Sequence, residues 1–188
     1  QAPDDEVLAR NLAYAYFVRG KQRLEDFDLD GASSDYREAI ETFDGEPGYS
    51  LHLATLQIRR YELLPALKTL RAAVGRPPEN ADVYLLTGDV LSLYDSLPEA
   101  REAYELAIEH GEGAVVENAK RLKARTERQI AVESDYRTET TGSFIIRHPP
   151  DTNFLELADV LERARSEVCN ELDTFPRNKA LVVLYPPD

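Results

Sequence analysis

A pattern of small and large residues that recurs every 34 positions constrains this chain more than any other feature. Its clearest copy has small residues at Gly88, Ala100 and Ala107 and large ones at Tyr84 and Tyr104. Two short antiparallel helices need this alternation if their backbones approach closely while an aromatic ring fills the remaining space. One such pair cannot bury its own apolar faces, so the pattern predicts a stack of helix pairs.

Two earlier copies precede this one at the same period. One has Leu53, Ala54, Ala66, Leu70 and Ala73, and the other has Tyr16, Gly20, Ala32, Tyr36 and Ala39. We expect the paired helices at about 4–25, 32–43, 49–61, 64–74, 81–94 and 98–110. A further helix at about 114–132 is expected to cap the array, because a terminal helix with one polar face covers the last exposed groove.

At these positions the sequence resembles the tetratricopeptide repeat family, whose 34-residue helix-turn-helix unit has Gly or Ala, Ala, an aromatic residue and Ala at this spacing. The family closes each repeat with Pro; Pro78 stands there in the second copy, Glu112 in the third and Asp44 in the first. The resemblance implies a mainly α fold. It consists of a three-repeat α-solenoid with a capping helix over 1–132, followed by a small α/β segment over 133–188.

The resemblance also implies a concave groove lined by the first helix of each repeat. The positions carried over are Tyr14, Phe17, Lys21 and Leu24, then Leu51, Thr55, Ile58 and Arg59, then Leu85, Asp89, Ser92 and Leu93. This mixture of apolar and charged groups suits an extended peptide or a helix of a partner protein. Some members grip a C-terminal carboxylate with Lys and Asn at set groove positions, and this specificity is not expected here. Those positions hold Phe17 and Lys21, Leu51 and Thr55, then Leu85 and Asp89. The alternative is that the chain's own tail or terminal helix fills the groove.

After Glu133 the spacing changes to that of a small α/β unit. Strands are expected at 136–139, 143–148 and 180–185, and a helix is expected from Asn153, its N-cap, to Asp173. The helix has an apolar side made of Phe154, Leu157, Leu161, Ala164, Val168 and Leu172. The second strand, this helix and the third strand form a βαβ unit, in which the two strands run parallel. The exposed edge at Ala180–Tyr185 offers a route to oligomerisation.

The segment 133–188 carries a second resemblance. The residues concerned are Phe144, Ile145 and Arg147 of the strand, Leu161, Glu162 and Ala164 of the helix, and Pro176, Leu181, Val182, Val183, Tyr185 and Pro186 near the end. In them the segment is similar to the opening of the peptidase MA-like metallohydrolase domain of the gluzincin type, which in bacterial proteins often follows a tetratricopeptide array.

That resemblance implies a zinc motif H-E-x-x-H, in which two His side chains one helical turn apart hold the metal. The chain does not contain the motif, because His52 is followed by Leu, His110 by Gly and His148 by Pro. We therefore expect no catalytic residue, no metal site and no cofactor in this chain. Each of the three histidines is expected to be an ordinary surface or groove residue.

The formal net charge of −13 disfavours nucleic acid as a partner, because phosphate binding needs a concentrated basic surface. Most of the acidic excess lies in 1–114, so a basic or mixed-charge protein surface is the expected match, although an acidic surface also serves solubility alone. The stripe Lys120, Arg121, Arg125 and Arg128 is either a solvated helix face or a charge contact, with an acidic partner or with this acidic array.

Few features bear on the compartment. No apolar run reaches the roughly 18 residues that a membrane span requires. The sole cysteine, Cys169, lies on an expected helix face and is predicted to be a buried small hydrophobe. The chain begins with Gln and contains no Met, which a cleaved signal peptide or a start downstream of the natural one would explain. An extracytoplasmic compartment is favoured over the cytoplasm, and the question stays open.

The sequence thus favours a protein-interaction scaffold or adaptor that binds a peptide or protein in its groove. The alternative is the N-terminal part of a zinc metallopeptidase whose H-E-x-x-H half lies beyond this chain. Finding that motif in a longer natural chain would decide between the two.

Overall fold

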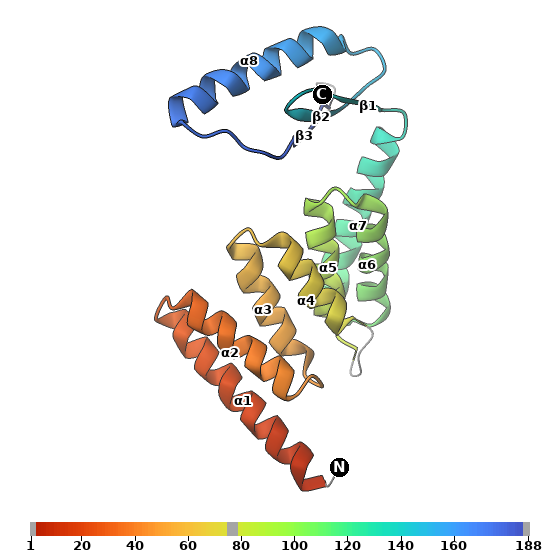
Figure 1. Cartoon of the computed structure of the whole chain (residues 1–188). Coiled ribbons are helices and arrows are strands. Elements are labelled where there is room, and N and C mark those ends of the chain that lie inside the picture. Colours follow the sequence, from red (N-terminus) through yellow and green to blue (C-terminus); the bar gives the residue numbers. More distant parts are fainter. Residues whose placement is uncertain (1–2, 75–78, 186–188) are drawn as a thin grey trace. The chain divides into compact units, whose positions relative to one another are not determined.

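A computed structural model describes residues 3–74 and 79–185 (Figure 1). Pro78, expected to close the second repeat, lies outside the described residues, as does Pro186. The chain forms two compact units, 1–127 and 128–188, and each is described by itself. The domain boundary was expected after residue 132, a few residues beyond residue 127 in the helix that spans 114–133. That expected boundary stays a prediction.

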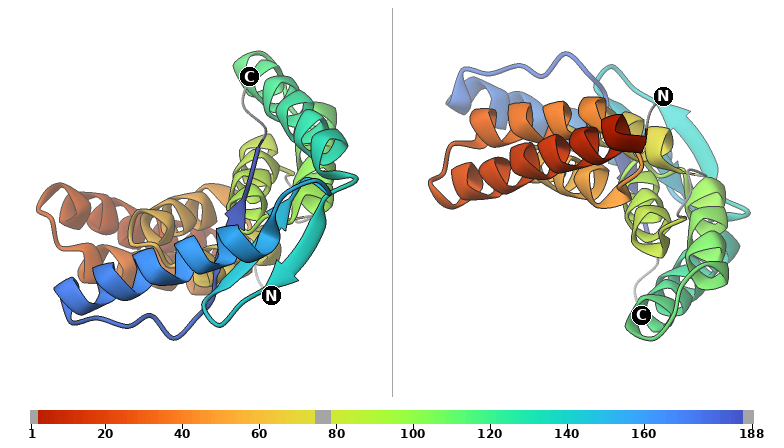
Figure 2. Two further views of the ribbon diagram at one scale, coloured as in Figure 1. Left: turned by 90° about the horizontal axis from the view of Figure 1, so that it is seen from above. Right: turned by 90° about the horizontal axis from the view of Figure 1, so that it is seen from below.

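The first unit is a stack of helix pairs, as the 34-residue period predicts. The pairs are α1 (Pro3–Glu25) with α2 (Leu29–Thr42), α3 (Pro47–Arg59) with α4 (Leu63–Ala73), and α5 (Ala81–Leu93) with α6 (Leu97–Glu109), and α7 (Ala114–Glu133) follows them. Figure 2 shows α1 and α2 side by side in both views. Contacts of α2 with α3, of α4 with α5 and of α3 with α5 join the pairs into one array.

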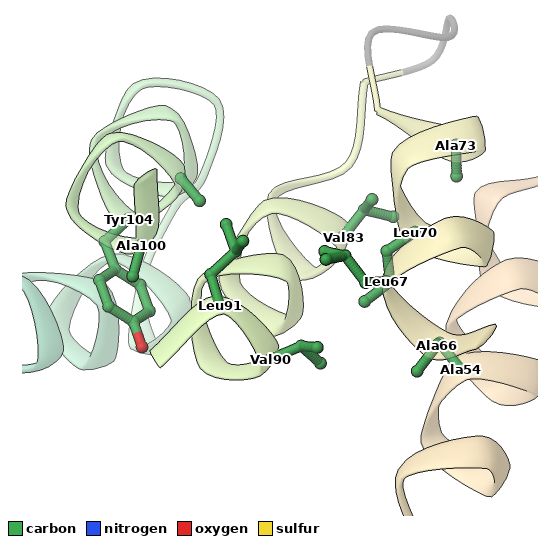
Figure 3. Packing of buried hydrophobic residues seen from close by; sticks show 11 residues of the cluster. Ala54, Ala66, Leu67, Leu70, Ala73, Val83, Val90, Leu91, Ala100 and Tyr104 are labelled. Carbon is green, nitrogen blue, oxygen red and sulfur yellow. The ribbon is translucent and has the colours of Figure 1, made fainter. Parts of the chain in front are cut away.

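The small residues of the pattern lie where one helix meets an aromatic ring of its partner. A Cβ atom built on Gly88 would lie 2.5 Å from Cε1 of Tyr104, and one built on Gly20 would lie 2.8 Å from Cε1 of Tyr36. In the second pair the same positions hold Ala54 and Leu70, both fully buried. Leu70 and Tyr104 belong to the core cluster that runs from α3 to α6 (Figure 3). The predicted register of the helix pairs is thereby confirmed.

One predicted position of the repeat is wrong. The residue 34 positions before Tyr84 is Ser50, and Leu53 lies about one turn further along α3. Ser50 is 8% exposed, and Leu53, 3% exposed, packs with Tyr36. The second repeat therefore lacks the aromatic ring that Tyr16 and Tyr84 supply at this position.

The turn inside each helix pair repeats as closely as the helices do. Phe27, Tyr61 and Asp95 are spaced 34 residues apart, and each has a left-handed backbone with φ between 58° and 61°. After the first of these turns, the Asp28 side chain accepts a hydrogen bond from the Gly31 N–H and caps α2. Asp28 thus serves the helix start, where unpaired N–H groups need acceptors.

Helix α7 caps the array as expected. Its Ala119 is fully buried and packs in one cluster with Tyr84 and Ala107, and Lys123 forms an ion pair of 2.9 Å with Glu105 of α6. In the basic stripe, Lys120 pairs with Glu117 of its own helix. The stripe is therefore in part an ordinary helix face.

The second unit contains the expected βαβ arrangement. Strand β1 (Arg137–Thr140) pairs antiparallel with β2 (Phe144–His148), and β2 pairs parallel with β3 (Ala180–Val183), with α8 (Phe154–Leu172) between them in the chain. The strand order is β1-β2-β3, and Ile146 of the central strand is fully buried. The last strand thus lies at an edge of the described sheet, as predicted.

Several details of the second unit differ from expectation. His148 is 1% exposed and stacks on Phe154 at 5.6 Å, so it is not a surface histidine; like Ile146, it follows the period of two along β2. The Asn153 side chain makes no capping hydrogen bond. On the apolar side of α8, Val168 and Leu172 are 52% and 69% exposed. Cys169, 5% exposed, is buried as predicted.

Candidate functional site

The face formed by α1 and α3 carries a hollow of about 260 Å³, which is the candidate site. Its lining consists of Leu24, Leu51, His52, Thr55, Leu56 and Arg59. Four of these residues, Leu24, Leu51, Thr55 and Arg59, were predicted to line the groove. The α3 residues recur at spacings of three, four and seven, which places them on one side of that helix. We call this feature the α1–α3 hollow.

The predicted residues of α1 divide between packing and surface. The half-buried Phe17 ring lies 5.0 Å from Tyr49, 5.8 Å from Tyr36 and 4.9 Å from His52, centroid to centroid. Phe17 therefore packs against the core, and it contacts the hollow through His52. Tyr14 is 59% exposed at 6.5 Å from the Phe17 ring, and the Lys21 ammonium stands over that ring at 5.9 Å.

Two residues of the lining, His52 and Leu56, were not among the predicted groove residues, and His52 was expected only as an ordinary surface or groove histidine. Burial, and then the neighbouring positive charge of Lys21, lower the pKa of His52 below its ordinary value. The imidazole is thus favoured in its neutral form, and Lys21 and Arg59 supply the positive charge around the hollow. His52 could have been found from its spacing of three and seven to Thr55 and Arg59.

Two predicted residues of α5, Asp89 and Ser92, form a separate polar group with Tyr104. Tyr104 of α6 donates a hydrogen bond of 2.9 Å to Oδ1 of Asp89, and its hydroxyl lies 3.2 Å from Oγ of Ser92. Burial raises the pKa of Asp89, against the opposing effects of the Tyr104 hydrogen bond and the positive charge of Arg121. Leu85 is half-buried and packs against the core. These α5 residues are thus engaged within the array, and they do not line the α1–α3 hollow.

The charge of the site differs from the charge of the whole chain. Arg59 lines the α1–α3 hollow, Lys21 acts electrostatically on His52 of its lining, and Arg121 of α7 acts electrostatically on Asp89. Among the residues that the structure describes, no carboxylate lines the hollow, although the chain carries a net charge of −13. An apolar hollow with a cationic border favours an occupant that is apolar and acidic.

Neither metal coordination nor a membrane span is evident in the described part of the chain. Within 3–74 and 79–185, no group of three or more His, Cys, Asp and Glu side chains is arranged around a common point that could hold a metal ion. Among the same residues, no helix combines the length and the apolar character that crossing a bilayer requires.

A stack of antiparallel helix pairs defines the class of helical-repeat proteins, in which each repeat packs on its neighbours. The family model described as "Tetratricopeptide repeat-like domain" matches residues 10–127. The chain therefore belongs to the tetratricopeptide repeat-like family. The match ends within α7, so it does not extend to the sheet.

Solved structures share this fold at low sequence identity. The first TPR of Spaghetti (RPAP3) bound to HSP90 peptide SRMEEVD is similar with a TM-score of 0.57 and 17% identity, over 65% of this chain and 95% of that one. The Arabidopsis OM64 TPR domain gives 0.56 and 17%, over 65% and 99%. The Sgt2 TPR domain from Aspergillus fumigatus gives 0.55 and 20%, over 63% and 79%. None of the curated proteins compared matches the sequence.

Proposed function

We propose that this chain is a protein-interaction adaptor that binds an extended acidic segment of a partner protein in the α1–α3 hollow. The observation that carries the proposal is the hollow itself, where Leu24 and Leu51 provide apolar surface beside the guanidinium of Arg59. An extended peptide that places one apolar side chain in the hollow brings a neighbouring acidic side chain within reach of Arg59 or Lys21.

This proposal changes the expected charge of the partner. The net charge of −13 favours a basic or mixed-charge surface, whereas the residues at the hollow favour an acidic one. Local charge decides a short-range contact, because exposed charges more than about 8–10 Å apart are largely screened at physiological salt. The SRMEEVD peptide bound by the Spaghetti TPR is itself acidic, which supports the choice of partner chemistry.

The test is fluorescence anisotropy with labelled SRMEEVD and with SRMQQVN, in which amides replace its three carboxylate side chains. We expect SRMEEVD to bind more tightly, and Arg59→Glu to weaken its binding by about tenfold or more, because attraction becomes repulsion. Arg71→Glu is the matched control: both arginines are exposed, and both stand in the last turn of their helix, α3 and α4 respectively. Equal binding of the two peptides, or equal effects of the two substitutions, would contradict the proposal.

The peptidase alternative has no comparable support. Neither the family model nor the similar structures point to a metallohydrolase in 133–188, and the family match ends at residue 127. Oligomerisation through the edge strand β3 likewise stays a prediction.

A further inference from the structure

A second and larger concavity lies on the other side of α3. This cleft, which we call the α2–α4 cleft, has a volume of about 680 Å³ and is lined by residues of α2, α3 and α4 and of the α2–α3 connection. Ser50, Leu53 and Gln57 of α3 line it. By helical spacing these residues stand on the face of α3 opposite to Leu51 and Thr55. The α2–α4 cleft is thus distinct from the α1–α3 hollow.

The cleft exists because the second repeat has small or polar residues where the third has large ones. The residues at 34-residue spacing are Ser50 and Tyr84, Gln57 and Leu91, and Ala72 and Leu106. Tyr84 and Leu91 are 4% and 5% exposed and fill the interior of the third repeat. Ser50, Gln57 and Ala72 thus leave open a space that Tyr84, Leu91 and Leu106 fill in the third repeat.

The side chains deep in the α2–α4 cleft are polar and nearly buried. Gln57 is 4% exposed, and its Oε1 accepts a hydrogen bond of 3.0 Å from Oγ1 of Thr69. With Oε1 engaged, the NH₂ group is the donor that this carboxamide offers to an occupant. The Gln57 carboxamide thus stands beside Leu53 and Ile40 in the lining, and a polar group placed among apolar ones is typical of a ligand site.

The charges around the cleft are unequally distributed. Glu41, Asp44 and Glu46 line it around the C-terminus of α2, and the last turn of α4 reaches the same region through Ala72 and Ala73. Helix C-termini carry partial negative charge, so they add to the attraction that Glu41 and Asp44 exert on a cation, whereas the Glu46 carboxylate caps the N-terminus of α3. Arg37 and Lys68, which also line the cleft, lie further back along α2 and α4.

From these observations we infer that the α2–α4 cleft binds a short extended segment of a partner protein, in which an apolar side chain stands next to a Lys or Arg. The apolar side chain fills the space between Ile40, Leu53 and Ala72, and the cation meets Glu41 at the end of α2. Gln57 supplies a hydrogen bond to the main chain of the segment. The two concavities therefore take segments of opposite charge.

The inference is tested by two-dimensional NMR titration of the full chain with the hexapeptides GSFRSG and GSFESG. We expect GSFRSG to shift the side-chain amide signals of Gln57 and to bind about fivefold or more tightly than GSFESG, because the cleft end is acidic. Filling the cleft with the residues of the third repeat, as Ser50→Tyr, Gln57→Leu and Ala72→Leu together, should abolish this binding. Ala72→Leu alone should weaken it and keeps the test valid if the triple variant does not fold.

Controls separate the inference from the proposed function. Glu41→Gln should reduce the preference for GSFRSG over GSFESG, whereas Arg59→Glu, at the α1–α3 hollow, should leave GSFRSG binding unchanged. Binding of SRMEEVD should survive Ala72→Leu. Equal binding of the two hexapeptides, unchanged binding to Ala72→Leu, or loss of GSFRSG binding in Arg59→Glu would overturn the inference.

Discussion

Single atoms set the distance between the helices of each pair. The absence of a Cβ at Gly88 lets α5 approach the ring of Tyr104, and Gly20 does the same for Tyr36. In the second pair, Ala54 carries a Cβ and Leu70 replaces the ring. The two combinations are alternative solutions for filling the same space at interior packing density.

We predict that Gly88→Ala destabilises the first unit by about 1–3 kcal/mol, because the added methyl overpacks against Tyr104. In a Tyr104→Leu background the same substitution should cost much less, since the pair then matches Ala54 and Leu70 of the second repeat. Chemical denaturation of the four proteins of this double-mutant cycle measures the coupling, expected to be about 1 kcal/mol or more. Additive effects would show that the ring and the glycine do not share this space.

The helix pairs could be predicted from the sequence because their signal is local and periodic. Gly20, Gly88 and their partner rings recur at a fixed spacing, and each helix is long enough to show its apolar face. The tight packing of Phe17 could not be predicted in this way. It depends on how α1 crosses α3 and brings Tyr49 and His52 to the same ring.

The candidate site was predicted in part, and for a different reason. Thr55 and Arg59 were expected because the resemblance to the repeat family carries groove positions over to the first helix of each repeat, and helical spacing keeps these positions on one side of α3. The α2–α4 cleft was not predicted. The expected pattern has Leu53 at the position of Tyr84, whereas Ser50 occupies that position, so the pattern does not reveal that the second repeat lacks an aromatic ring there. In the second unit, Cys169 of α8 is buried, whereas the neighbouring Val168 is exposed. The sequence of the helix alone could not predict this, because the buried side depends on where the rest of the unit packs against the helix.

At the scale of the elements, the helices differ in how their first turns are satisfied. Asp28 caps α2 through its side chain, and Asn80 caps α5 by accepting from the N–H of Asp82. The N-cap residue of α6, Ser96, makes no such hydrogen bond. Residues of similar capping propensity therefore contribute unequally here.

We predict that Asp28→Ala lowers the unfolding free energy by about 1 kcal/mol, the usual cost of losing an N-cap side chain. Ser96→Ala is the control and should cost less than about half of that, because no side-chain hydrogen bond is lost. Thermal melts followed by circular dichroism compare the two. A larger loss for Ser96→Ala would contradict the assignment of the caps.

At the scale of the whole molecule, the chain consists of two units of different construction, 1–127 and 128–188. The first has a core that is continuous from α3 to α6, whereas the second is a small sheet with one long helix. The end of α7 belongs with the sheet, since the Glu133 carboxylate binds Arg147 of β2 and accepts from the Tyr185 hydroxyl. We propose that the two units unfold independently.

Hydrogen exchange tests this proposal with one core truncation in each unit. Ile146→Ala and Leu70→Ala remove fully buried side chains, and each should cost its own unit about 2–5 kcal/mol. Ile146→Ala should lower protection of β1–β3 and α8 and leave α1–α6 unchanged, and Leu70→Ala should do the reverse. Equal loss of protection in both units after either substitution would show one cooperative structure.

The paired packing of Gly88 with Tyr104, and of Ala54 with Leu70, also bears on how such an array changes over generations. If Gly88 changes to Ala first, the added methyl group overpacks against the Tyr104 ring. If Tyr104 changes to Leu first, the lost ring leaves a cavity. Either single step therefore lowers stability. Copying a whole repeat transfers both partners together and meets no such barrier. Duplication of complete units is therefore an easier path for this scaffold than gradual change at these positions.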